Sequence, residues 1–215
     1  MFVTRASAFA IRMLIPLILF GSAGVSPAWS QDAEDPDVSS DAILNDAAAP
    51  VAGNPKGNIT IVTFFDYNCP FCKKAEPSLE RLVKEDGHIR LVYKDWPILT
   101  KPSVYGAQLA LAAKYQGKYD AVHAALMAIP GIKIPEDQML AAVRASGVDV
   151  NRLDADLKIH ANEITALLGR HLAQADSLGL QGTPAYLVGH FKVSQALTYE
   201  GFKRAVADAR AQAKK

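Results

Sequence analysis

The pattern of hydrophobic and polar positions along the chain changes from strand-like to helical and back, and its order predicts an α/β fold. Residues 59–65 form a short β-branched and aromatic apolar run, which is typical of a strand covered on both faces. Residues 70–86 then follow helical spacing, and Gly87 ends the predicted helix. Residues 89–93 alternate apolar and polar side chains, which predicts a second strand.

The second half of the chain predicts a helical block and then a return to strands. Residues 101–178 are rich in alanine and keep helical spacing, with a break expected near Asn162. Residues 185–188 and 191–194 are expected to pair as a hairpin, and Thr198 is expected to cap a terminal helix. The predicted order is therefore strand, helix, strand, helical block, two strands and helix.

The first thirty residues have the pattern of a targeting segment. Arg5 and Arg12 supply positive charge, an apolar stretch follows that is too short to span a bilayer comfortably, and small residues surround Trp29. Residues 1–30 are therefore interpreted as a signal peptide that is cleaved near Ser30, with an uncleaved anchor as the alternative. We expect the protein to be exported to the periplasm.

Residues 31–57 are acidic and are punctuated by proline and glycine. This composition predicts a solvated, flexible leader, in which residues 40–46 form a short helix. The alternative is an arm that joins subunits into a homo-oligomer. The domain proper is then expected to cover residues 58–215.

The only two cysteines of the chain lie where the first strand meets the first long helix. Cys69 stands at the predicted N-cap, Pro70 at the first helical position and Cys72 one turn deeper. A sulfur at a helix N-terminus faces unpaired N–H groups and the positive end of the helix dipole, which favour the thiolate. A thiolate is the nucleophile of disulfide exchange. The pair is therefore interpreted as a redox pair, in which Cys69 attacks and Cys72 resolves.

Other interpretations of the cysteines are weaker. A structural zinc site needs four ligands, and the chain has no second cysteine pair and five scattered histidines. A purely structural disulfide between residues three apart would remove little entropy from the unfolded chain. No metal and no cofactor is therefore expected beyond the cysteine pair itself. Composition adds an exclusion, because a net charge of +1 over 215 residues gives no sign of a nucleic-acid partner.

Together these residues resemble DsbA-like thiol:disulfide oxidoreductases, which are periplasmic proteins. The resemblance covers residues 58–215 and rests on Cys69-Pro70-Phe71-Cys72, on the helical block and on Thr183-Pro184 before the next strand. It implies an α/β, thioredoxin-like fold with an inserted helical subdomain at about 101–178. It also implies that Pro184 is cis and faces the cysteines, so that Thr183 and Pro184 position an extended substrate peptide.

Two departures from this family bear on the direction of the reaction. Many members carry an acidic residue six positions before the first cysteine, where this chain has Thr63, so that assistance to Cys72 must come from elsewhere. Strongly oxidising members carry histidine between the cysteines, where this chain has Phe71. Pro70 and Phe71 are therefore expected to tune the pair towards a less oxidising potential, and Thr183 is more like the isomerase and reductase branches.

The sequence thus predicts an exported thiol:disulfide oxidoreductase that favours isomerase or reductase activity over oxidase activity. Its expected partners are unfolded or misoxidised secreted proteins and a membrane redox partner that recycles the pair. The alternative is a non-catalytic periplasmic chaperone or metal-handling module on the same fold. The substrate proteins, the recycling partner, the reduction potential and the oligomeric state are left open by the residues.

Overall fold

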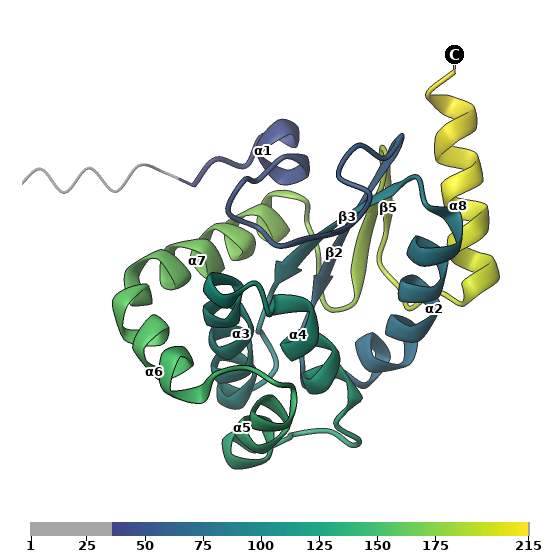
Figure 1. The fold of residues 1–215 in the computed structure, drawn as a ribbon. Helices are drawn as coiled ribbons and strands as arrows, with labels where there is room; N and C mark the ends of the chain where they lie inside the picture. The colour runs from purple at the N-terminus through teal and green to yellow at the C-terminus, as the bar shows by residue number, and fades with distance from the viewer. Residues whose placement is uncertain (1–35, 215) are drawn as a thin grey trace, which may run out of the picture. The chain divides into compact units, whose positions relative to one another are not determined.

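The computed structural model describes residues 36–214, which fold around one mixed β-sheet (Figure 1). The predicted signal peptide lies outside the described residues. The sheet order is β1-β3-β2-β4-β5, in which β2 and β3 are parallel and the other neighbours are antiparallel. Its strands are β1 (Val51–Gly53), β2 (Ile59–Phe65), β3 (Ile89–Asp95), β4 (Ala185–Val188) and β5 (Phe191–Val193).

One helix connects β2 to β3, a terminal helix follows β5, and a block of helices stands between β3 and β4 in the chain. The helices are α1 (Ser40–Leu44), α2 (Pro70–Asp86), α3 (Lys101–Ala113), α4 (Tyr119–Ala128), α5 (Glu136–Ala145), α6 (Val150–Ile159), α7 (Ala161–Ser177) and α8 (Tyr199–Gln212). The predicted element order is confirmed, and the predicted hairpin forms, with Val188 opposite Phe191. The expected break near Asn162 occurs at His160, which ends α6 and precedes α7.

Each face of the sheet is covered by its own group of helices, so that β2 is buried on both sides. Ile61 and Phe65 point into a core shared with α2, α3, α4 and α8. Val62 and Phe64 point to the opposite face, where they pack with residues from α1 and α7. The apolar run of β2 was therefore correctly interpreted as a strand with two buried faces.

The expectation of a flexible leader over residues 31–57 is corrected for its described part. Ile43 in α1 is buried against the sheet, and β1 adds an antiparallel edge strand to β3. Gly57 lies so close to β3 that a Cβ there would stand 2.5 Å from the carbonyl oxygen of His88. The glycines and acids that indicated flexibility are thus partly explained by close packing, and the folded unit begins before residue 58.

The acid that fastens this segment is Asp46, which binds two cations from distant parts of the chain. Its carboxylate accepts hydrogen bonds from Lys94 at 2.9 Å and from both ends of the Arg170 guanidinium fork at 3.1 Å. Burial by itself would raise the pKa of Asp46, but the hydrogen bonds from Arg170 and Lys94 outweigh it and hold the pKa well below its usual range. Lys94 is fully buried, so that Asp46 is its necessary counter-charge.

We expect Asp46→Asn to lower the free energy of unfolding by about 3–5 kcal/mol, because it leaves the buried Lys94 without its counter-charge. Urea denaturation at neutral pH measures the effect, with the exposed Asp154→Asn as the matched control. Because the pKa of Asp46 is depressed in the folded state, its contribution is present above the unfolded value of roughly 4 and is lost as pH falls. The difference in free energy of unfolding between the wild type and Asp46→Asn should therefore shrink in acid. An equal loss in both variants would contradict this account.

Candidate active site

The turn between β2 and α2 is fixed by the side chains that precede Cys69. Asp66 accepts the backbone N–H of Asn68 at 2.7 Å with one carboxylate oxygen and that of Leu99 at 2.9 Å with the other. The Asn68 side chain donates to the Thr100 hydroxyl at 2.9 Å and accepts the N–H of Ile134 at 2.5 Å. Both side chains are buried. The start of α2 is therefore held against the helical block from two directions.

Cys69 is the N-cap of α2, as the sequence predicted, and its sulfur is the capping atom. Its Sγ accepts the backbone N–H of Cys72 at 3.4 Å and, as a thiol, donates to the carbonyl oxygen of Thr183 at 3.2 Å. The hydrogen bond from the Cys72 side chain, opposed by burial and assisted by Thr183 and the helix N–H groups, lowers the pKa of Cys69 to about 6. Cys69 is therefore largely a thiolate at neutral pH.

Cys72 has the opposite character. Burial, and then the hydrogen bond and charge of Cys69, raise the pKa of Cys72 well above its usual range. Both cysteines are free thiols. The pair therefore combines a thiolate that can attack with a protonated thiol that must lose its proton before it can resolve.

The Thr183–Pro184 peptide bond is cis and lies beside Cys69, as the resemblance implied. The buried Thr183 side chain favours the thiolate form of both cysteines, although burial and Cys69 keep the pKa of Cys72 raised. Thr183 therefore acts on the cysteines through its side chain as well as through its backbone carbonyl.

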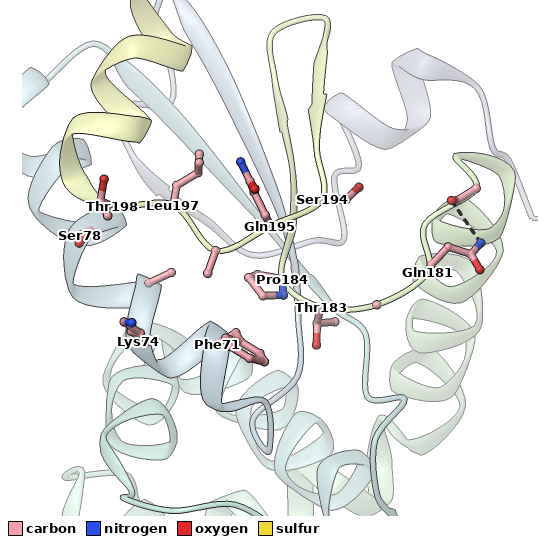
Figure 2. Close-up of a pocket in the computed structure, with 14 residues that line it drawn as sticks. Phe71, Lys74, Ser78, Gln181, Thr183, Pro184, Ser194, Gln195, Leu197 and Thr198 are labelled. Carbon is pink, nitrogen blue, oxygen red and sulfur yellow. Dashed lines mark hydrogen bonds between the residues drawn. The ribbon is translucent and has the colours of Figure 1, made fainter.

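A groove of about 760 Å³ runs along the cis peptide, and we call it the cis-proline groove. Phe71 and Lys74 of α2 stand on one side of it and Thr183 and Pro184 on the other (Figure 2). The connection between β5 and α8 closes its end. Phe71 is 61% exposed, so that an apolar ring stands free at the rim of the groove beside the pair.

A buried polar chain lies beneath the inner face of α2, and the sequence analysis missed it. Glu76, one turn after Cys72, bonds His123 Nε2 at 3.1 Å, and His123 Nδ1 bonds the Tyr67 hydroxyl at 3.0 Å. His123, one of the five scattered histidines, is fully buried. The signal was its place between Val122 and Leu126, on the apolar stripe of α4.

Thr63 is buried in β2 and carries no carboxylate, so the acid near Cys72 comes from Glu76 instead. Residues four apart in a helix share a face, which places Glu76 beside Cys72. Burial is the main cause of the raised pKa of Tyr186, and the charges of Cys72, Glu76 and Cys69 add to it. Glu76 is thus a second buried carboxylate near the pair, besides Asp66 in the turn before Cys69.

Within residues 36–214 no three histidine, cysteine or acidic side chains are close enough to hold a metal ion. In the same part of the chain no helix is both long and apolar enough to cross a membrane.

The fold and this pair define a thioredoxin-fold protein with a redox-type active site and a helical insertion. A family model described as Thioredoxin matches residues 45–208, and the chain therefore belongs to the thioredoxin family. The match begins before residue 58, in agreement with the folded leader.

Solved structures place the chain beside the DsbA-like thiol:disulfide oxidoreductases. A thioredoxin-like oxidoreductase from Silicibacter pomeroyi DSS-3 is 42% identical with a TM-score of 0.76, and the match covers 80% of this chain and 98% of that one. The thiol-disulfide exchange protein alpha-DsbA2 from Wolbachia pipientis is 26% identical with a TM-score of 0.73, and covers 78% and 90%. The predicted resemblance and fold class are confirmed.

Curated relatives include much longer proteins. The Na(+)/H(+) antiporter NhaA 1 of Salinispora arenicola is 29% identical over 162 residues, which is 74% of this chain and 24% of the antiporter. The chain thus spans about a quarter of the length of that relative.

We expect the alkylation rate of Cys69 to rise with pH around a half-point near 6, because only the thiolate reacts. Cys72→Ala removes the largest cause of the lowered pKa and should move the half-point to higher pH, and Thr183→Val should move it less. The ultraviolet absorbance of the thiolate measures both. Since the folded pKa lies below the unfolded value of roughly 8.5, the reduced protein should also gain stability between pH 6 and 8.5. Identical half-points in all three proteins would refute this assignment.

Proposed function

We propose that this protein is an exported thiol:disulfide oxidoreductase that acts on secreted proteins and favours reduction or isomerisation over oxidation. The observation that carries the proposal is the contrast between the two sulfurs. Cys69 caps α2 with a pKa of about 6, while the buried Cys72 has a raised pKa. This is the division of labour that disulfide exchange requires, because one sulfur must attack and leave easily and the other must wait.

The exchange follows from these two sulfurs. The Cys69 thiolate attacks a substrate disulfide, one S–S bond breaks and another forms, and the departing substrate sulfur leaves as a thiolate. Cys72 then loses its proton and attacks Cys69 Sγ, which releases the second substrate sulfur. The substrate disulfide has gained two electrons and the Cys69–Cys72 pair has lost them. In isomerisation a different cysteine of the substrate, as a thiolate, instead attacks the substrate sulfur of the mixed disulfide; a new substrate disulfide forms, Cys69 leaves as a thiolate, and the pair returns to its reduced form.

Thr183 and Pro184 are proposed to position the substrate. The Thr183 carbonyl oxygen faces Cys69 Sγ at 3.2 Å, and both residues line the cis-proline groove. An extended peptide in this groove would pair with the exposed backbone as an added strand, which makes little demand on its side chains. This suits an enzyme whose substrates are unfolded or misoxidised secreted proteins of many sequences.

Glu76 is proposed to accept the proton that Cys72 must lose. Glu76 lies one turn after Cys72 on the buried face of α2. It also lines a second groove, which lies on the side of α2 away from the cis-proline groove. A carboxylate between a buried thiol and a groove can pass the proton outwards. His123, which bonds Glu76, holds the carboxylate in place.

We expect Glu76→Gln to slow resolution of the mixed disulfide by about a hundredfold, because the amide accepts no proton. Single-turnover release of a disulfide-linked peptide measures this step. The deficit should fade at high pH, where hydroxide deprotonates Cys72, and the alkylation rate of Cys69 should stay close to that of the wild type. Glu80→Gln, one turn further along α2, is the control. A deficit that does not change with pH would indicate a structural role and would sink the proton-acceptor assignment.

Phe71 supports the reducing or isomerising direction. A histidine at this position could stabilise the Cys69 thiolate with a positive charge, whereas an exposed phenylalanine ring carries none. Lys73 and Lys74 follow the pair, but Lys73 turns away to donate to the Ile129 carbonyl oxygen at 2.6 Å. A pair kept reduced needs a membrane redox partner that supplies electrons, and residues 1–30 supply the export signal.

Isomerases of this type generally need to be oligomers, and the leader was one candidate arm for a homo-oligomer. The described part of that leader packs on the chain's own sheet. An isomerase assembly would therefore need a different contact surface, and light scattering distinguishes a monomer from a dimer.

Acid quenching of cells followed by alkylation with a mass tag tests the proposed function. In the wild type we expect the pair to be mostly reduced, because a reductase or isomerase is kept supplied with electrons. In Cys72→Ser we expect mixed disulfides with secreted proteins to accumulate, since nothing resolves them, and the Cys69→Ser, Cys72→Ser double variant is the control. A mostly oxidised pair in the wild type would instead indicate an oxidase, which donates disulfides to its substrates. Absence of mixed disulfides in Cys72→Ser would remove the activity itself.

A further inference from the structure

A second groove of about 670 Å³ lies on the side of α2 opposite the cis-proline groove, and we call it the α4 groove. Pro70, Lys74 and Pro77 of α2 form one wall, and Met127 of α4 lies in the other. The connection between α4 and α5, residues 129–134, closes its end with Ile129 and Ile132. Lys74 lines both grooves, so that the two meet over the first turns of the active-site helix.

The connection 129–134 is tied at both ends to residues that adjoin the cysteine pair. Lys73, next to Cys72, donates from Nζ to the carbonyl oxygen of Ile129 at 2.6 Å. Asn68, next to Cys69, accepts the backbone N–H of Ile134 at 2.5 Å. The active-site motif thus fixes where this loop stands, although it belongs to the helical insertion.

The tied loop presents one apolar side chain to solvent. Ile129 and Ile134 are buried as anchors, whereas Ile132 between them is 60% exposed. The backbone turns sharply here, with φ of 94° at Gly131 and 55° at Lys133, the one non-glycine residue between 36 and 214 with positive φ. A strained turn that holds an isoleucine out of the core needs a reason other than folding.

Phe71 and Ile132 therefore stand in the two grooves that border the first turns of α2. Each is about three-fifths exposed, Phe71 lines the cis-proline groove and Ile132 lines the α4 groove. A single exposed apolar residue on a protein surface is ordinary. Here there are two, one in each groove that borders the reactive helix. A substrate chain extends from its cysteine in two directions, towards its N-terminus and towards its C-terminus, so each groove can take the chain on one side.

We propose that the α4 groove, with Ile132 at its end, binds an apolar side chain of the polypeptide whose cysteine is joined to Cys69. This inference rests on the proposed function. The cis-proline groove takes the chain on one side of the substrate cysteine, and the α4 groove takes a side chain on the other. The occupant is an extended, unfolded segment, because the groove continues from the active site and its lining is mainly apolar with the adaptable Met127.

Mixed-disulfide exchange in the Cys72→Ser protein isolates this binding from the chemistry of attack. Glutathione joined to Cys69 is replaced by a single-cysteine peptide, with one S–S bond broken and one formed, and mass spectrometry gives the exchange constant. The peptides carry one leucine among glycines, at each of the four positions before and after the cysteine. We expect leucine on one side to raise the constant about tenfold through Ile132, the effect of burying one aliphatic side chain.

Adding Ile132→Ser should abolish the preference on that side and leave the preference on the other side and the glycine peptide unchanged. The matched control is Ile159→Ser, which removes an isoleucine that is 72% exposed at the end of α6 and should change nothing. An unchanged preference in Ile132→Ser, or an equal loss in Ile159→Ser, overturns the proposal. So does a normal peptide preference combined with an altered resting redox state in cells, which would assign the loop to the recycling partner. If Cys69 forms no mixed disulfide with glutathione or any peptide, the proposed function itself fails.

Discussion

The hydrogen bonds of Asp66 and Asn68 in the turn after β2 are the constraint on which the rest of the site depends. They set the first residue of α2, and the first residue decides that the sulfur of Cys69 is the atom that caps the helix. The lowered pKa of Cys69 follows from that placement, because the Cys72 side chain, and then the Thr183 side chain and the N–H groups at the helix start, favour the thiolate. A turn displaced by one residue would leave the same two cysteines without their chemical difference.

The same turn explains why the helical insertion belongs to the active site. Asn68 reaches α3 through Thr100 and the α4–α5 connection through Ile134. Glu76 reaches α4 through His123, and Lys73 reaches the end of α4 through Ile129. Every one of these contacts comes from within one or two turns of the cysteines. The insertion therefore supports the reactive helix and shapes one of its two grooves, in addition to covering the sheet.

Buried charge is used differently on the two faces of the sheet. On the face covered by α1 and α7, an ionic cluster joins the leader to β3 and α7. It consists of Asp46, Lys94 and Arg170, and each charge has a partner. On the face covered by α2, α3, α4 and α8, the hydrogen-bonded side chains of Glu76, His123 and Tyr67 lie near the Cys72 thiol, which has to change its protonation state. The first arrangement stabilises the fold, and the second can move a proton, because it lies near the reacting group and borders a groove.

The sequence by itself determined the element order, the cap at Cys69, the hairpin and the roles expected of the two sulfurs, because all of these depend on local spacing and on one residue type at one place. The resemblance to DsbA-like proteins, rather than spacing, pointed to Thr183 and Pro184. Tertiary structure alone decided that the acidic leader folds, since Asp46 meets Lys94 and Arg170, which are 48 and 124 residues away. It also decided that Glu76 meets His123 and that the loop carrying Ile132 is tied to Lys73 and Asn68. Such contacts join residues that no periodicity relates, and their energies depend on burial, which a chain acquires only when it folds.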